Sequence, residues 1–577
     1  MADTVREIER KYEADDSTEL PDLTGVAGVE AIADQGTVVL SATYYDTPDQ
    51  RLAADGITLR RRTGGSDAGW HLKLPVAPGV RDEVRMPPAD RLPPKLAALV
   101  RSRVRGTRLA PVAHLRTRRT LRVLEDARGE PLAEVAVDEV VAHRVDGTER
   151  EDGALGQGQD QGQGQNQGMA SSGRVAVGAR WREIEVELVG EGTPVLLDAV
   201  EEVLLTSGVR PAASASKLAR ALAETAEQPR GGGGAKEAER PEGAEGVKGA
   251  KKSEGMKGAK RGGRGGRGKR SERGKKGKET RTPPTAGEAV LAYVHEQVRA
   301  LVELDPAVRR DVPDSVHQMR VATRRLRSAF RSYGAVLDRS ATDPIGVELK
   351  WLAGELGVDR DREVLAERLR AGLADLPRTL RLGPVAARLR LWSQRRRLGS
   401  RESLLAVLDG ARHLALLDSL HALLAAPPLR PAAARPPARV MVKAVLKDYR
   451  RLDGRMAAAL AAPPGTERDE ALHAARKAAK RVRYTAEAAR PVLGRPAKKF
   501  ATRMKRVQQL LGDHQDSVVA RAALRDLAVQ AHSAGEGGFS FGLLYGREEA
   551  AAAARERELP EVWRKASKKA HRRKLRG

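Results

Sequence analysis

The sequence predicts a multidomain α+β protein whose N-terminal part is an antiparallel sheet or barrel and whose C-terminal part is all α-helix. Three observations predict this fold class. Residues 1–226 contain short runs of alternating apolar and charged residues, separated by Gly and Pro clusters, as in antiparallel strands. Residues 284–577 change to a helical period in Ala-, Leu- and Arg-rich segments. The chain also has 577 residues, and because a single core stops growing near ~250–300 residues, several domains are expected.

The composition points to a polyanionic partner. The formal net charge of +27 favours nucleic acid, an anionic membrane or a phosphate polymer. Aromatic residues make up only 3% of the chain, which argues against stacking platforms for single-stranded nucleic acid. The lack of cysteine excludes disulfides, thiolate metal sites and cysteine nucleophiles. Neither a signal peptide nor an apolar run long enough to span a bilayer is visible, so we expect a cytoplasmic protein without membrane insertion.

The first predicted strand carries Glu7-Ile8-Glu9-Arg10-Lys11, in which Glu7, Glu9 and Lys11 share one face because side chains alternate along a strand. Two carboxylates beside an ammonium group could hold a hard divalent cation and one phosphate oxygen. A second acidic stripe with the same period runs from Glu183 to Leu188, and the two stripes could meet on neighbouring strands. From spacing alone, the solvated charged face of an ordinary strand is the more frequent explanation.

Further runs between these stripes place charged side chains on one face of a strand in the same way. They are Arg60 and Arg62, Lys73, Arg81 and Arg85, Arg116 and Arg118, and Glu134 and Asp138. Two arrangements fit this pattern. Either the apolar faces form a core and the charges face water, or the charged faces line a tunnel and the apolar faces pack under outer helices such as 194–205. Periodicity favours neither arrangement.

Five separated motifs resemble the CYTH family, also known as the triphosphate tunnel metalloenzymes, in the expected order over residues 3–223. They are Glu7–Lys11, Tyr44-Tyr45-Asp46-Thr47, Leu59-Arg60-Arg61-Arg62, His71-Leu72-Lys73 and Glu183–Glu187. The resemblance implies an eight-stranded antiparallel β-barrel tunnel with flanking helices. It also implies that acidic residues hold Mg²⁺ or Mn²⁺ in the tunnel and that basic residues grip a linear triphosphate.

Residue by residue, the resemblance implies metal ligands at Glu7, Glu9, Asp138 and members of the set Glu183, Glu185 and Glu187. It implies phosphate contacts from Lys11, Arg60, Arg62, Lys73, Arg118 and Lys217, with Arg81, Arg85 and Arg116 as further candidates. Glu7, Glu9 and Lys11 are the expected catalytic residues. Such a set suits phosphoanhydride hydrolysis, which chiefly needs positioning and charge neutralisation. Residues 151–174, a Gln- and Gly-rich insertion before the late acidic stripe, are expected to be disordered.

Residues 227–283 consist of Gly, Lys, Arg and Glu with almost no apolar residues, and they include an RGG-like run at Arg261–Arg267. We expect a flexible tether. Two roles fit it: binding of polyanions such as polyphosphate or, non-specifically, RNA, and a solvated spacer that its charge keeps extended.

The helical half carries an internal repeat. The run from His317 to Arg327 corresponds to the run from His473 to Arg483, and Leu356–Asp361 corresponds to Leu511–Asp516. Positions i, i+3, i+7 and i+10 of a helix lie within about 80°, so each run forms a basic stripe, and no acid interrupts it. The candidate anion-binding residues are His317, Arg320, Arg324, Arg325, Arg327, His473, Arg476, Lys477, Lys480, Arg481 and Arg483.

This repeated signature resembles the CHAD domain, a conserved-histidine α-helical module, over residues 285–550. The resemblance implies two pseudo-symmetric helical bundles around a basic pore that binds inorganic polyphosphate, and Asp361 and Asp516 are expected to fix basic side chains. Together the two resemblances predict an Mg²⁺- or Mn²⁺-dependent triphosphatase with a polyphosphate-binding module, associated with polyphosphate granules. An adenylate cyclase-type activity, a non-catalytic polyphosphate scaffold and an RNA-binding protein are the alternatives. Tripolyphosphate, longer polyphosphate, thiamine triphosphate and nucleotides all stay open as substrates.

Overall fold

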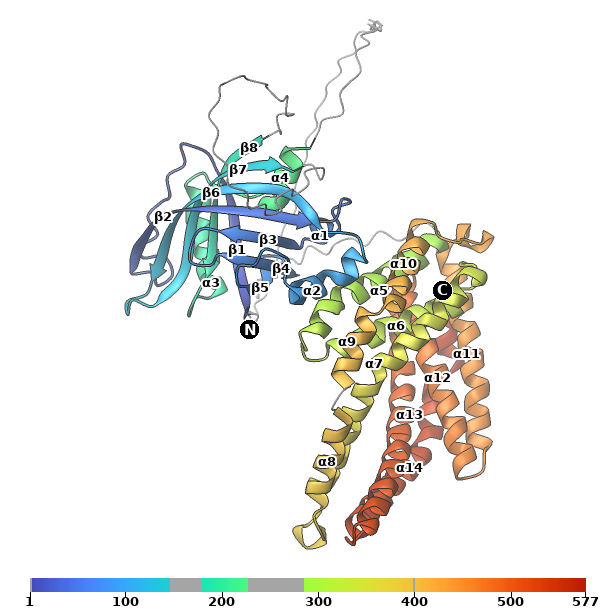
Figure 1. Ribbon diagram of the computed structural model, residues 1–577. Helices are drawn as coiled ribbons and strands as arrows, with labels where there is room; N and C mark the ends of the chain where they lie inside the picture. The colour runs from blue at the N-terminus through green and yellow to red at the C-terminus, as the bar shows by residue number, and fades with distance from the viewer. Residues whose placement is uncertain (1–2, 146–177, 227–284, 398–399, 577) are drawn as a thin grey trace, which may run out of the picture. The chain divides into compact units, whose positions relative to one another are not determined.

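A computed structural model describes residues 3–145, 178–226, 285–397 and 400–576 (Figure 1). The predicted insertion at 151–174 and the predicted tether at 227–283 lie outside the described residues. The described N-terminal residues form a β-barrel with short flanking helices, and those from 285 onward form a helical domain (Figure 1).

The barrel contains eight antiparallel strands, which confirms the predicted fold class. The strands are β1 (Asp3–Ala14), β2 (Ala31–Asp46), β3 (Thr58–Thr63), β4 (Gly69–Ala77), β5 (Val80–Met86), β6 (Ala110–Glu125), β7 (Pro131–Arg144) and β8 (Gly178–Leu188). They follow the order β5-β4-β3-β2-β6-β7-β8-β1, and pairing of β1 with β5 closes the barrel. A two-residue strand, β9 (Arg210–Pro211), pairs with β1.

Strand β1 brings the two acidic stripes together because each half of it pairs with a different neighbour. Its residues 3–8 pair with β5, whereas residues 9–14 pair with β8. In this register Glu9 lies opposite Glu187 and Lys11 lies opposite Glu185. The two acidic stripes therefore lie on neighbouring strands of one barrel.

The apolar faces of the strands pack outward under helices, so the charged faces point inward. Helix α3 (Pro194–Thr206) covers a buried cluster that includes Ile184 and Val186, and helix α2 (Pro94–Val104) covers one that includes Leu59 and Leu72. A short helix, α1 (Arg51–Ala54), precedes β3. Helix α4 (Lys217–Glu224) packs its leucines against inward-facing apolar residues and so closes one end of the barrel. Of the two arrangements that periodicity allowed, the structure has the charged interior.

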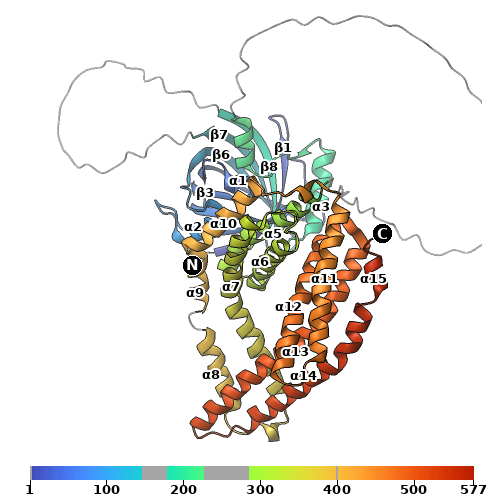
Figure 2. The same cartoon turned by 90° about the vertical axis from the view of Figure 1, so that its right-hand side faces the viewer.

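The helical domain contains eleven α-helices in its described residues (Figure 2). They are α5 (Ala286–Arg309), α6 (Ser315–Ser332), α7 (Arg339–Ala374), α8 (Val385–Arg397), α9 (Ser400–Asp409), α10 (Ala411–Ala425), α11 (Pro437–Ala461), α12 (Thr466–Ala488), α13 (Arg490–Ser533), α14 (Phe539–Ala566) and α15 (Lys569–Arg573). The first basic stripe lies on α6 and the second on α12, and α6 contacts α12 directly. One hydrophobic core runs through both repeats, with Leu326 of α6 and Val482 of α12 fully buried in it. None of the described helices is both long enough and apolar enough to cross a bilayer.

Candidate functional site

The barrel interior holds a cavity of about 620 Å³. Nine basic and seven acidic side chains line it, so the cavity walls carry both the cations that bind phosphate and the carboxylates that bind metal. The predicted site residues that line it are Glu7, Glu9, Lys11, Arg60, Arg62, Lys73, Arg81, Arg85, Glu185, Glu187 and Lys217. The structure thus brings together side chains that come from five strands and one helix.

A group of carboxylates from β1 and β8 forms one side of this cavity. Glu7 and Glu9 are buried, at 1% and 6% exposure, and Glu187 lies on the strand beside them. Within the described residues Glu187 makes neither a hydrogen bond nor an ion pair. Burial and the neighbouring carboxylates of Glu7 and Glu9 raise its pKa to about 7. Neighbouring buried carboxylates on two paired strands favour a bound cation, and carboxylate oxygens are the ligands that Mg²⁺ and Mn²⁺ prefer. The residues present therefore fit a hard divalent cation.

A second carboxylate group, on β7 and β8, is already neutralised by the protein. One oxygen each of Asp138, Glu183 and Glu185 lies within 4.8 Å of the others. The Lys217 ammonium, however, lies 2.9, 2.7 and 2.6 Å from these three carboxylates. Arg119 donates two hydrogen bonds to Asp138, of 2.8 and 2.7 Å, and one of 2.6 Å to Glu185. One ammonium group contacts all three carboxylates here, whereas Glu187 of the first group pairs with no cation among the described residues. The second group therefore fits the role of positioning Lys217 and Arg119 better than that of binding metal.

The basic side chains of β3, β4 and β5 surround one buried carboxylate that sequence reasoning missed. Glu83 is 1% exposed and accepts a hydrogen bond of 2.9 Å from Nδ1 of His71. The Arg60 guanidinium and the Lys73 ammonium each lie 3.7 Å from it, and Arg85 pairs with its other oxygen. Lys73 also pairs with Glu7 at 2.7 Å. Glu83 therefore holds three cations toward the cavity.

Lys11 and Arg62, which both line the cavity, also pair with acids. The Lys11 ammonium donates to Glu9 at 3.0 Å and also pairs with Glu185. Arg62 pairs with Asp67, while burial and the guanidinium groups of Arg60 and Arg119 lower its pKa. Crowded cations of this kind are stabilised by a bound anion.

The prediction that Arg116 and Arg118 contact phosphate in the cavity is wrong, because it assigns their side chains to the wrong face of strand β6. Both side chains are exposed on the outer face of β6, whereas the neighbouring Arg119 lines the cavity. Alternation along β6 correctly puts Arg116 and Arg118 on one face, but that face is the outer one. Because Arg118 and Arg119 are consecutive, the sequence offers no local signal that distinguishes them. Glu83, by contrast, alternates with Arg81 and Arg85 and could have been found from that spacing.

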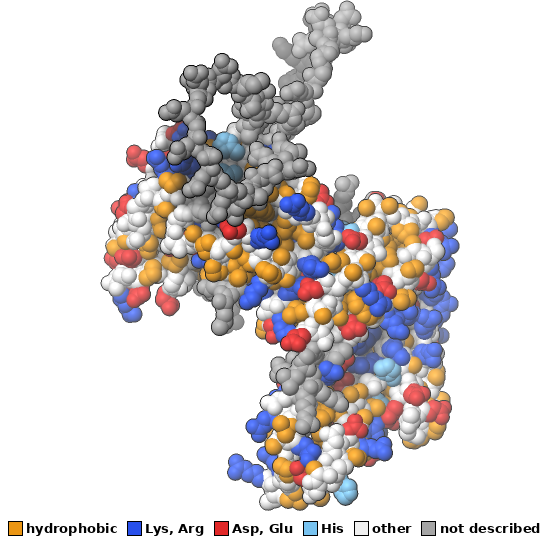
Figure 3. Space-filling model, in the orientation of Figure 1, with side chains coloured by type: hydrophobic (Ala, Val, Ile, Leu, Met, Phe, Trp, Pro, Cys, Tyr) orange, Lys and Arg blue, Asp and Glu red, His pale blue; other side chains and the backbone are white. Residues whose placement is uncertain are grey.

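The helical domain carries a separate basic site. Lys and Arg side chains gather over one face of this domain (Figure 3). A pocket of about 330 Å³ lies between α6 and α12, and its basic lining residues are Arg324, Arg327, Arg331, His473, Arg476, Lys477, Lys480 and Arg481. Of the predicted set, His317 is exposed and does not line this pocket. Arg325 and Arg483 flank Tyr484 and pair with Glu487 at 3.3 and 3.6 Å.

In each repeat, a glycine and an aspartate of α7 or α13 lie next to the first arginine of the basic stripe. Arg320 makes two hydrogen bonds of 2.7 Å to Asp361, and Arg476 lies 3.6 Å from Asp516. A Cβ atom added to Gly357 would lie 2.7 Å from an Arg320 nitrogen, so only glycine lets the guanidinium lie across α7. The corresponding distance at Gly512 is 3.4 Å, to Arg476. The two aspartates thus hold basic side chains, as expected.

The stripe carries more positive charge than nearby acids balance. Burial, together with Arg476, Arg324 and Arg320, lowers the pKa of Lys480 to about 7. Burial and Arg320 likewise lower the pKa of Arg324. His473 donates a hydrogen bond of 2.6 Å from Nδ1 to Gln515, which fixes its ring at the pocket edge. An anion in the pocket would relieve this repulsion.

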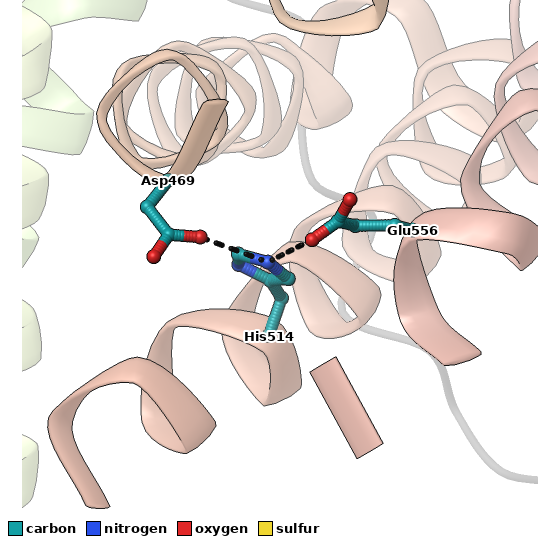
Figure 4. Close-up of side chains that lie close together, drawn as sticks. All are labelled: Asp469, His514 and Glu556. Atoms are coloured by element: carbon teal, nitrogen blue, oxygen red, sulfur yellow. Dashed lines mark hydrogen bonds and ion pairs between the residues drawn. The ribbon is translucent and has the colours of Figure 1, made fainter. Parts of the chain in front are cut away.

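A third group of ionisable side chains, which sequence reasoning missed, joins α12, α13 and α14 (Figure 4). Nε2 of His514 lies 3.4 Å from Asp469 and 3.1 Å from Glu556, and His514 is 2% exposed. Each carboxylate also pairs with an arginine, Asp469 with Arg521 at 3.0 Å and Glu556 with Arg468 at 3.1 Å. Because both acids already have cationic partners, this group is an ion-pair network between three helices.

Comparison with known proteins finds two domain families in this chain. Residues 5–222 match the CYTH domain and residues 292–525 match the CHAD domain. The chain is 37% identical over 570 residues to the uncharacterized protein MT2285 of Mycobacterium tuberculosis, covering 96% of this chain and 95% of that protein. Among solved structures, PptA from Streptomyces chartreusis is 23% identical with a TM-score of 0.42 and matches 49% of this chain and 100% of that one. The CHAD domain from the plant Ricinus communis is 24% identical with a TM-score of 0.41 and matches 50% of this chain and 93% of that one.

Proposed function

Because the chain belongs to the family of proteins in which a CYTH domain precedes a CHAD domain, we propose that its barrel hydrolyses triphosphate-type phosphoanhydrides with a divalent metal. We further propose that its helical domain binds inorganic polyphosphate. The observation that carries the proposal is the carboxylate of Glu187, which pairs with no cation among the described residues and lies beside Glu7 and Glu9 in a cavity that nine basic side chains also line.

The metal would be held by Glu7, Glu9 and Glu187, with Glu185 beside them. When bound, Mg²⁺ or Mn²⁺ supplies charge neutralisation at the phosphoryl oxygens. The alternative set of Asp138 and Glu183 is less favourable because Lys217 contacts both.

The cations of the barrel would bind the triphosphate oxygens. In the structure these cations pair with carboxylates, as Lys73 does with Glu7 and Arg60 does with Glu83. Phosphate oxygens would take over these pairings, and guanidinium groups would make bidentate contacts that an ammonium cannot make. Arg119 would be one of these contacts, in place of Arg116 and Arg118.

The proton of the attacking water would pass to a carboxylate of β1. Burial opposes ionisation of Glu9, but the ammonium groups of Lys11 and Lys73 together outweigh burial and lower the pKa of Glu9, so this group stays ionised. Glu9 is therefore present in the unprotonated form that can accept a proton, and Lys11 would hold the adjacent phosphate oxygen.

The test is a substrate panel with the full-length protein. Tripolyphosphate, long-chain polyphosphate, thiamine triphosphate and ATP are each incubated with Mg²⁺ or Mn²⁺, and orthophosphate and cyclic AMP are both measured. Orthophosphate release that requires the metal is expected. Formation of cyclic AMP without orthophosphate release would support the cyclase alternative, and no product from any substrate would leave a polyphosphate-binding scaffold.

A further inference from the structure

The pocket of about 330 Å³ between α6 and α12 is here called the stripe pocket. Beside it lies a second basic pocket, here called the end pocket, which no motif predicted. It has a volume of about 590 Å³ and lies where α6 packs against α7, α11 and α12. Six of its basic lining residues have no acidic partner within 4 Å in the described part of the chain. They are Arg327, Arg331, Lys350, Lys447, Arg451 and Arg481.

The acids of the end pocket do not balance these cations. Asp343 pairs with Arg339, another lining residue, at 2.7 Å. Asp448 is 5% exposed and accepts hydrogen bonds of 2.5 Å from Ser332 and 2.8 Å from Thr485. Nε of Arg327 is buried and has no hydrogen-bond partner among the residues that the structure describes. The six cations are therefore left to be neutralised by something outside the described protein.

The end pocket and the stripe pocket form one track because they share three residues, Arg327, Arg331 and Arg481. Arg331 lies one helical turn beyond Arg327 on α6. From Arg324 to Arg331 the track covers about 10 Å along the helix axis, at ~1.5 Å per residue. Lys447 and Arg451 then continue it on α11, where their i,i+4 spacing places them on one face.

The chemistry of the end pocket fits phosphate rather than nucleic-acid bases. Base stacking needs an accessible aromatic ring. Phe330, the aromatic residue that touches the pocket, is 1% exposed and belongs to the hydrophobic core. Burial and neighbouring guanidinium groups lower the pKa of Arg327 and of Arg481, as expected for cations that lack an anion.

We propose that the end pocket binds the continuing segment of a polyphosphate chain whose first segment lies on the repeated stripe. The helical domain then distinguishes polymers by length, because a short chain fills the stripe pocket alone and a long chain fills both. This proposal rests on the binding half of the proposed function.

The test compares two charge-matched variants of the full-length protein. Lys447→Ala/Arg451→Ala removes two cations of the end pocket, and the control Lys443→Ala/Arg450→Ala removes two exposed cations of the same helix that line a different groove. All four side chains are exposed, so both variants should fold, which thermal melts will verify. Binding of fluorescent long-chain polyphosphate and competition by tripolyphosphate are measured at several salt concentrations.

The end-pocket variant should bind long-chain polyphosphate about tenfold more weakly. Its log–log salt slope should fall by roughly two, since two phosphate contacts are lost. Tripolyphosphate affinity should change by less than about twofold, and the control variant should match wild type in both assays. An equal loss in the control variant, or an equal loss for short and long chains, would overturn the inference.

A third variant separates failure of this inference from failure of the proposed function. Arg324→Ala/Lys480→Ala removes two cations of the stripe pocket. If it weakens polyphosphate binding while the end-pocket variant does not, only the length inference fails. If neither variant weakens binding, polyphosphate binding by this face fails as well. RNA that competes as strongly as polyphosphate of equal charge would overturn the assignment of the end pocket to phosphate chains.

Discussion

Lys480 should take up a proton when polyphosphate binds. In the free protein this lysine is crowded by burial and by Arg476, Arg324 and Arg320, with Asp516 as the opposing acid, so its pKa falls to about 7. A bound polyanion favours the protonated form. With a pKa near 7, only about one lysine in ten is protonated at pH 8 in the free protein, whereas about nine in ten are at pH 6. Affinity should therefore fall about tenfold between pH 6 and pH 8, with an uptake of about 0.9 proton per site at pH 8.

The assay is titration calorimetry with long-chain polyphosphate in buffers of different ionisation enthalpy. Lys480→Arg is the matched control because arginine stays charged throughout this range. It should bind with little proton uptake at pH 8 and should lose most of the pH dependence. Equal proton uptake by wild type and Lys480→Arg would refute the reasoning.

The same lowered pKa has a consequence for stability. The unfolded chain holds this proton up to the ordinary pKa of lysine, so the unfolded state binds more protons between about pH 7 and 10. Stability of the free protein should therefore rise with pH across this window, and the Lys480→Met variant should lose that rise. Urea denaturation at pH 7 and pH 9.5 measures both.

Further predictions concern the barrel and the three-helix ion-pair network. On β6, Arg119→Ala should lower triphosphatase turnover by about 10²-fold, whereas Arg118→Ala on the outer face should change it by less than about twofold. Equal losses would contradict the register of β6. Removal of divalent metal by a chelator should abolish orthophosphate release, and addition of Mg²⁺ or Mn²⁺ should restore it. Turnover that persists without metal would contradict the carboxylate site. His514→Ala should lower the free energy of unfolding by about 1–3 kcal/mol, because Asp469 and Glu556 lose a buried partner. A loss below about 0.5 kcal/mol in urea denaturation would show that the network is not stabilising.

Much of the barrel could be predicted because strand alternation leaves a clear trace in sequence. Glu7 and Glu9 on β1 and the late acidic stripe on β8 have the expected period, and both stripes face the interior. Periodicity alone does not show whether the charged faces of the strands point into the barrel or out to solvent. It is decided by helices α2 and α3, which cover the apolar faces.

Incorrect predictions arise where the residue type alone does not show which face of a strand carries the side chain. Arg118 and Arg119 are chemically equal, and only their pairing with Glu139 and Asp138 of β7 separates the outer face from the inner one. The role of Glu187 depends on Lys217, which neutralises the other acids from a helix about 30 residues away in sequence. Long-range contacts of this kind leave no local signal.

In the helical domain, the repeated basic stripe can be predicted from the sequence, but the cations that lie beside it in the fold cannot. Arg320 and Asp361 recur at equivalent positions with Arg476 and Asp516, so their pairing could be expected. Lys447 and Arg451 of α11, which complete the end pocket, do not belong to the repeated sequence motif. They join the track only because α6 packs against α11.

The most direct test of the central claim is orthophosphate release from tripolyphosphate by wild type, Glu9→Gln and Glu13→Gln with Mg²⁺ or Mn²⁺. Glu13 is a matched control because it lies on β1, on the same face as Glu9, but does not line the cavity. The account predicts metal-dependent release by wild type and Glu13→Gln, and loss of at least about 10²-fold in Glu9→Gln. No release by wild type with either metal, or full release by Glu9→Gln, would contradict it.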